Sequence, residues 1–133
     1  MHAALEEAKA AWERDEVPIG AVLVHADTGE IIAQNGNRTR ELSDPTAHAE
    51  IITIRDGCES ESKQRVPDYN LYVTLEPCQM CAGASYWTQI AKIVYGASEE
   101  KRGFLKMNST LHPKTKVIGG VLEGECGKLL TRF

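Results

Sequence analysis

The spacing of apolar residues along the first 37 positions predicts one helix followed by a β-hairpin. In "AALEEAKAAWER" the apolar residues recur at helical spacing, so we expect an amphipathic helix over residues 3–14. Beyond Pro18, "IGAVLVHADTGEIIAQNGN" has the pattern of two strands around a turn at Asp27, Thr28 and Gly29. The two strands of a hairpin must pair antiparallel.

The rest of the chain alternates between helical and strand patterns. Asp44, with Pro45 or Thr46, supplies a capping signal for a helix that begins near Ala47. The polar stretch over 56–68 predicts a surface connection rather than more of that helix. The expected elements are a helix over 47–55, a strand over 69–75, a buried helix over 78–90, a strand over 92–97, a short strand over 115–120 and a closing helix over 121–133.

These elements predict one α/β domain over residues 1–133. Strands that alternate with helices are typical of layered folds in which helices cover a mixed sheet. Strands joined through a helix are expected to run parallel, because a crossover returns the chain to the same end of the sheet. The length lies near the commonest domain size and allows a substantial core.

Composition narrows the class of protein. Hydrophobic residues make up 42% and charged residues 26%, a balance typical of soluble globular proteins. No apolar run approaches the ~18 residues of a membrane span, and the charged, helical N-terminus does not resemble a secretory signal. Four cysteines are too few and too unevenly spaced for a disulfide scaffold. We therefore expect a cytoplasmic protein whose thiols are free for metal or redox chemistry.

The charge balance bears on the choice of partner. A net charge of −4 argues mildly against nucleic acid, since phosphate binding depends on Lys and Arg. However, the segment from Lys101 to Leu122 contains five cations and no acidic residue. It could be a basic binding surface or simply a solvated loop.

The stretch "TLEPCQMCAGA" carries the first candidate chemistry, because Cys78 and Cys81 lie at the start of a predicted helix. This position brings both sulfurs within reach of one ion and lowers thiol pKa values. A thioredoxin-like dithiol also follows a strand, but such motifs usually hold proline or glycine between the cysteines, where this chain has Gln79 and Met80. A structural zinc site needs four protein ligands, and no second close Cys/His pair exists.

A catalytic metal site needs one more ligand and an open coordination position. "TAHAEII" supplies His48 as a ligand and Glu50 as a carboxylate two residues later. On a regular helix the two side chains would point ~200° apart, so they can share a site only if the helix begins there. Three ligands, one water and a nearby carboxylate form the catalytic zinc arrangement. The joint pattern of His-x-Glu and Pro-Cys-x-x-Cys favours this interpretation over a dithiol or a structural knot.

At these residues the chain resembles the zinc-dependent cytidine/adenosine deaminase superfamily, and within it the bacterial tRNA-specific adenosine deaminases. The likeness covers "DEVPIGAVLV", "NGNRTREL", "DPTAHAE", "LYVTLEPCQMCAGA" and "VYGA". It implies a cytidine deaminase-like fold, a three-layer α-β-α sandwich around a five-stranded mixed sheet. It also implies a homodimer with substrate pockets near the subunit interface.

The resemblance assigns roles to individual residues. His48, Cys78 and Cys81 would hold one Zn²⁺ per chain and leave the fourth position to water. Glu50 would take a proton from that water and deliver protons to the purine ring nitrogen and to the departing amine, so that adenosine becomes inosine.

Other residues match the substrate side of the family. Asn37 corresponds to an asparagine that hydrogen-bonds the base, and Val17 and Pro18 correspond to the apolar wall of the base pocket. The basic segment corresponds to the part of the chain that holds nucleic acid. We therefore expect a groove for the tRNA anticodon loop, bordered by Arg38, Lys101, Arg102 and Lys106.

Two other functions are compatible with the same motifs. One is a zinc deaminase that acts on a free base or nucleoside, such as guanine or cytosine. The other is a non-catalytic module that zinc stabilises, against which Glu50 argues, because a structural zinc site has no use for a spare carboxylate.

Overall fold

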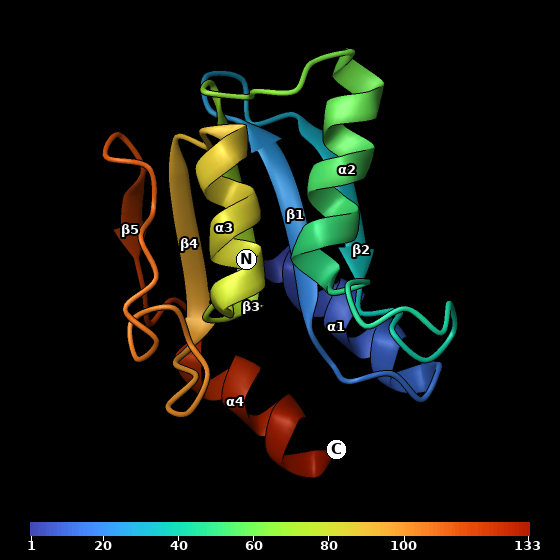
Figure 1. Ribbon diagram of the computed structural model, residues 1–133. Helices are drawn as coiled ribbons and strands as arrows, with labels where there is room; N and C mark the ends of the chain where they lie inside the picture. Colours follow the sequence, from blue (N-terminus) through green and yellow to red (C-terminus); the bar gives the residue numbers. More distant parts are fainter.

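The centre of the molecule is a five-stranded mixed sheet, seen in the computed structural model, which describes all residues 1–133 (Figure 1). The strand order is β2-β1-β3-β4-β5. β1 pairs antiparallel with both β2 and β3, whereas the β3–β4 and β4–β5 pairs are parallel. The strands are β1 (Gly20–His25), β2 (Ile31–Gly36), β3 (Tyr69–Leu75), β4 (Lys92–Ala97) and β5 (Lys116–Ile118).

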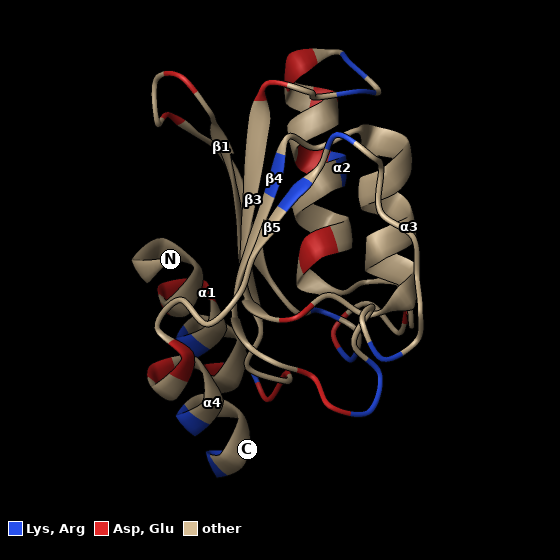
Figure 2. Cartoon of the chain, turned by 90° about the vertical axis from the view of Figure 1, so that its left-hand side faces the viewer, with Lys and Arg blue, Asp and Glu red and all other residues tan.

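Helices cover both faces of the sheet and complete three layers (Figure 1). The helices are α1 (His2–Glu13), α2 (Ala49–Glu61), α3 (Gln79–Thr88) and α4 (Glu123–Arg132). α2 and α3 pack on one face, and α1 and α4 pack on the other (Figures 1 and 2). None of the four helices has the length and apolar character that crossing a membrane requires.

Each face has its own hydrophobic core. Alternate residues of a strand face the same side, so Leu71 and Val73 of β3 join Ile93 and Tyr95 of β4 in the larger cluster, beneath α2 and α3. On the opposite face, a smaller cluster joins α1 and α4 through residues such as Leu5, Ala8, Cys126 and Leu129. The larger core holds the starts of α2 and α3 against the sheet.

The predicted architecture is confirmed, including the mixed sheet and the antiparallel hairpin. The boundary prediction was wrong for the second helix, because α2 continues to Glu61 through residues assigned to a surface connection. Gly57 lets this part of the helix pack closely on Leu23 of β1, and the Tyr69 hydroxyl donates a hydrogen bond to Glu61. The ends of four other elements moved by one or two residues: α1 begins at His2 and ends at Glu13, α3 covers 79–88, β5 covers 116–118 and α4 covers 123–132.

The expected cap of the second helix was also wrong. The residue that precedes the helix is His48, and no side chain caps it. Asp44 instead builds a tight local turn, because its carboxylate accepts hydrogen bonds from the Thr46 backbone N–H (2.9 Å) and hydroxyl (2.7 Å). These bonds lower the pKa of Asp44. The turn places His48 directly before the first residue of α2, but the turn itself does not cap the helix.

Candidate active site

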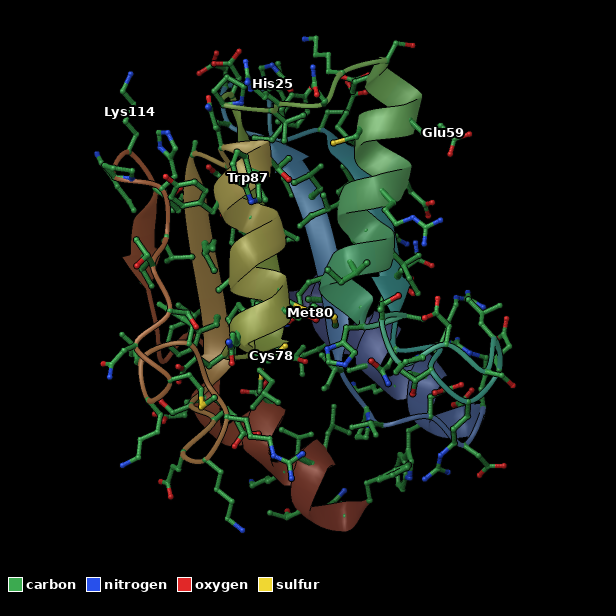
Figure 3. The ribbon with its side chains drawn as sticks, in the orientation of Figure 1. His25, Glu59, Cys78, Met80, Trp87 and Lys114 are labelled. Atoms are coloured by element: carbon green, nitrogen blue, oxygen red, sulfur yellow. The ribbon has the colours of Figure 1, made fainter.

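His48, Cys78 and Cys81 meet where two helices begin side by side. His48 and Cys78 are the residues that precede α2 and α3, and both have extended backbone, with φ of −71° and −76°. Cys81 lies in the first turn of α3. Their ligand atoms all lie within 4.8 Å of one another. Figure 3 shows Cys78 at the end of α3 that faces the start of α2.

The distances within this cluster fit a tetrahedral zinc ion. Each sulfur lies 3.6 Å from His48 Nδ1, and the two sulfurs lie 3.7 Å apart. Tetrahedral geometry with Zn–S of ~2.3 Å and Zn–N of ~2.05 Å requires S···N of ~3.6 Å and S···S of ~3.8 Å. The three donors are therefore spaced as zinc ligands. Cys78 and Cys81 do not form a disulfide, because their sulfurs lie 3.7 Å apart rather than the ~2.05 Å of an S–S bond.

The sequence predicted lowered pKa values for both thiols, but in the structure the pKa is lowered only for Cys78. A hydrogen bond from the Cys81 thiol lowers the pKa of Cys78 to about 4, whereas the same contact, together with burial, raises the pKa of Cys81. The hydrogen bond to Cys78 raises the pKa of His48. Cys78 is thus a thiolate near neutral pH, which is the form that binds metal.

Glu50 lies in the first turn of α2 and is 4% exposed. Burial raises the pKa of its carboxyl to about 7. It lines a cavity of about 160 Å³ together with His48 and Cys78. A carboxyl beside a metal site with a pKa near neutrality can both accept and donate a proton.

A wider opening leads into the same cluster. It has a volume of about 440 Å³ and is lined by His48, Cys78, Met80, Arg102 and others. Arg102 also lines the smaller cavity that contains Glu50. The structure therefore brings one of the predicted basic residues directly to the metal ligands.

None of the three predicted base-pocket residues lines either cavity, and Asn37 reaches one of them only through its neighbour Ile19. Asn37 directly follows β2, is 4% exposed, and its backbone N–H donates to Ile19 O (3.0 Å). Ile19 lines the cavity that contains Glu50. The Asn37 amide donates to Thr39 Oγ1 at 3.3 Å. Val17 is half-buried and Pro18 is buried, and neither lines the two cavities.

The predicted basic residues do not form one group. Arg38 pairs with Glu41, Nη1 to the carboxylate oxygens at 2.9 and 3.0 Å, so its charge is partly compensated. Lys106 lines a neighbouring depression with Ser98 and Glu99, and Lys101 is exposed beside Arg102.

The rest of the basic segment lies at the other end of the sheet. Lys116 pairs with Lys92 at the first residues of β5 and β4. Figure 3 shows Lys114 at the end opposite Cys78. The cations of the segment 101–122 therefore do not form one continuous surface. Only Lys101, Arg102 and Lys106 remain near the site.

Sequence reasoning missed Glu76, a buried carboxylate that lines the Glu50 cavity. Its signal was a charged residue between an apolar strand and Pro77, directly before a metal ligand. An acidic residue at the end of a buried strand needs hydrogen-bond donors there.

Comparison with known proteins identifies the family. The family described as "Cytidine and deoxycytidylate deaminase zinc-binding region" matches residues 1–97. The chain belongs to this family of zinc-binding deaminases. The resemblance inferred from the sequence is confirmed, and so is zinc as the cofactor, which the ligand spacing supports independently. The protein is a zinc-dependent hydrolytic deaminase.

Several known proteins are similar to this chain over most of its length. The tRNA-specific adenosine deaminase of Agrobacterium fabrum is 48% identical over 139 residues, covering 100% of this chain and 90% of the relative. A solved structure from work on A-to-I editing by tRNA:A34 deaminases matches with a TM-score of 0.91 and 48% identity, covering 98% and 97% of the two chains. Guanine deaminase from Bacillus subtilis matches with a TM-score of 0.68 and 36% identity, covering 73% and 61%.

Proposed function

We propose that this deaminase converts adenosine to inosine at the wobble position of tRNA. The observation that carries the proposal is the 48% identity, along the full chain, with a tRNA-specific adenosine deaminase. The match covers 90% of that relative's length. The site supplies the matching chemistry, with three zinc ligands and a buried carboxyl of raised pKa.

The chain's own residues supply binding and proton transfer. His48, Cys78 and Cys81 would hold zinc, which would supply a Lewis acid able to lower the pKa of water towards ~7. The Glu50 carboxylate would carry both protons of the attacking water, the first to the ring nitrogen and the second to the amine, which would leave as ammonia while the water oxygen stays on the ring carbon. Burial raises the pKa of Glu50 and so favours the protonated form that can return a proton.

The base must leave the RNA stack to reach these groups. A cavity of about 160 Å³ that contains Glu50 and opens beside a wider depression suits a base that is flipped out of a single-stranded loop. Asn37 would hydrogen-bond the base, and Val17 and Pro18 would border it. Arg102, with Lys101 and Lys106, would hold the phosphates of the anticodon loop, and the ion-paired Arg38 would contribute less.

The proposed enzyme acts as a homodimer in the cytoplasm, where tRNA is found. An exposed apolar side chain supports the dimer, because Trp87 on α3 is 76% exposed and lies next to Tyr86. Light scattering of the purified protein at micromolar concentration should give twice the mass of the 14.6 kDa chain. A monomer mass would refute this part of the proposal.

Guanine deamination is a second candidate, favoured by the 36% identity with the Bacillus subtilis guanine deaminase. A substrate panel separates the two. The purified protein is incubated separately with tRNA, adenosine, cytidine, cytosine and guanine, and ammonia release is measured. Release from tRNA alone, with inosine in the digested product, supports the proposal. Release from guanine without release from tRNA refutes it.

A further inference from the structure

Glu76 lies between β3 and the metal ligand Cys78 and is 4% exposed. Its own backbone N–H donates to Ala97 O at the end of β4 (2.8 Å). No Lys or Arg forms an ion pair with it. A carboxylate buried without a cation must be compensated by hydrogen-bond donors.

Two backbone N–H groups provide that compensation, and both belong to one segment. Oε1 accepts from Glu99 N (3.2 Å) and Oε2 accepts from Leu105 N (3.1 Å). The carboxylate therefore ties together the two ends of residues 99–105. The segment is also joined to the chain at the metal ligand Cys78, because Phe104 N donates to Pro77 O (2.9 Å) and Gly103 forms a β-bridge with Cys78.

Gly103 shows how closely this segment fits the carboxylate. A Cβ at position 103 would overlap Glu76 Oε2 and would lie 2.6 Å from Glu99 O. The requirement for glycine here comes from this close approach. Arg102, which lines both cavities of the site, directly precedes it.

We propose that Glu76 is a positioning residue that fixes segment 99–105 beside the zinc ligands and thereby sets the affinity for RNA. The proposal rests on the proposed function, because Lys101 and Arg102 of this segment are the residues proposed there to contact RNA. Both Glu76 oxygens are occupied by backbone N–H groups, so the residue acts through the segment rather than on the substrate.

Glu76→Gln tests the proposal, because it keeps the shape and loses one of the two acceptors. The glutamine amide NH₂ would face a backbone N–H, leaving that donor unpaired. Amide exchange should accelerate at Glu99 or Leu105. The Kd for an anticodon stem-loop should rise about tenfold, the worth of a charge-assisted hydrogen bond, with kcat at saturation within about twofold of wild type.

Two matched variants isolate the cause. Glu100→Gln removes the same charge from an exposed position in the same segment, so it should leave RNA affinity equal or slightly stronger. Glu16 is also buried, and its carboxylate accepts from Arg40 N (3.2 Å) and Glu41 N (2.7 Å) in the loop between β2 and α2. Glu16→Gln should therefore accelerate exchange at Arg40 or Glu41 and leave Glu99 and Leu105 protected.

Gly103→Ala disturbs the same contact from the other side and should repeat the effect of Glu76→Gln. Zinc content and cooperative melting are measured for every variant. The proposal is overturned if Glu76→Gln leaves both amides protected or leaves RNA affinity unchanged. It is also overturned if both Glu76→Gln and Gly103→Ala lose zinc, because Glu76 would then support the whole site. Failure of the wild type to bind RNA would instead refute the proposed function.

Discussion

At the scale of single residues, position within the helix decides what each polar group of the site can do. His48 and Glu50 are two residues apart, and the start of α2 falls between them. The extended backbone of His48 turns its ring to the sulfurs, while Glu50 enters the helix and is buried. The same carboxylate two residues later would lie ~200° further around the helix and would point away from the metal ligands.

Glu50→Gln should abolish most activity while keeping the fold and the zinc. The amide cannot exchange a proton, and acid/base catalysis by one carboxylate is worth about 10²–10⁴-fold. Zinc content, melting temperature and the single-turnover rate of inosine formation are the measurements. Glu59→Gln is the control, because Glu59 is exposed near the far end of the same helix (Figure 3) and should leave the rate unchanged. A folded, zinc-loaded Glu50→Gln variant with near-normal turnover would exclude Glu50 as the proton carrier.

At the scale of elements, the strands could be predicted from the sequence, and so could the starts of α2 and α3 to within two residues. Alternating apolar residues mark β3 and β4, and the ligand motifs require helices to begin beside them. The second half of α2 could not be predicted, because Gly57 and the polar residues after it have the composition of a loop. The reason for Gly57 lies in Leu23, which is distant in sequence. Glu76 was missed for a similar reason, since its donors come from residues 99 and 105.

Gly57→Ala should destabilise the protein, although alanine favours helix by about 1 kcal/mol over glycine. A Cβ at this position would overlap Leu23 Cδ2 in the core, and overpacking costs about 1–3 kcal/mol. Gly127→Ala in α4 is the control, because nothing lies within 4 Å of its added Cβ, and it should raise stability by up to about 1 kcal/mol. Urea unfolding at constant zinc measures both. A stabilised Gly57→Ala variant would contradict the packing argument.

Removal of zinc should lower the melting temperature, because the ligands join the starts of two helices that are 30 residues apart in sequence. An ion that binds only the folded state adds about 2.7 kcal/mol at a hundredfold excess over its Kd, which corresponds to about 5 °C or more in a domain of this size. Calorimetry before and after dialysis against a chelator gives the shift. The control is Cys81→Ala, which should melt at the same temperature in both conditions. An unchanged wild type would show that the ion contributes no folding energy.

At the scale of the whole molecule, topology divides the charges that the sequence places together. β5 pairs parallel with β4, so the chain must return along the sheet after β4 before β5 can begin. β4 spans six residues, or ~20 Å, and the return separates Lys101, Arg102 and Lys106 from Lys114 and Lys116. Figure 2 shows cations at both ends of the sheet, with acidic residues between and beside them. Spacing along the sequence could not reveal this division, because it depends on which strand β5 joins.

The division supplies a matched test of where RNA binds. Lys101→Glu with Arg102→Glu should weaken binding of a tRNA anticodon stem-loop and flatten its salt dependence, because each lost phosphate contact removes about 0.9 or less from the slope of log K against log salt. Lys114→Glu with Lys116→Glu makes the same change in net charge at the opposite end of the sheet. A purely long-range effect would act alike on both double variants, and screening over ~10 Å at 0.1 M salt should confine the loss to the pair beside the zinc ligands. Titration of each variant at two salt concentrations, with zinc content as the check on the site, decides between the two. Equal losses in both would show that net charge governs binding, and a larger loss in the Lys114/Lys116 variant would move the RNA to the other end of the molecule.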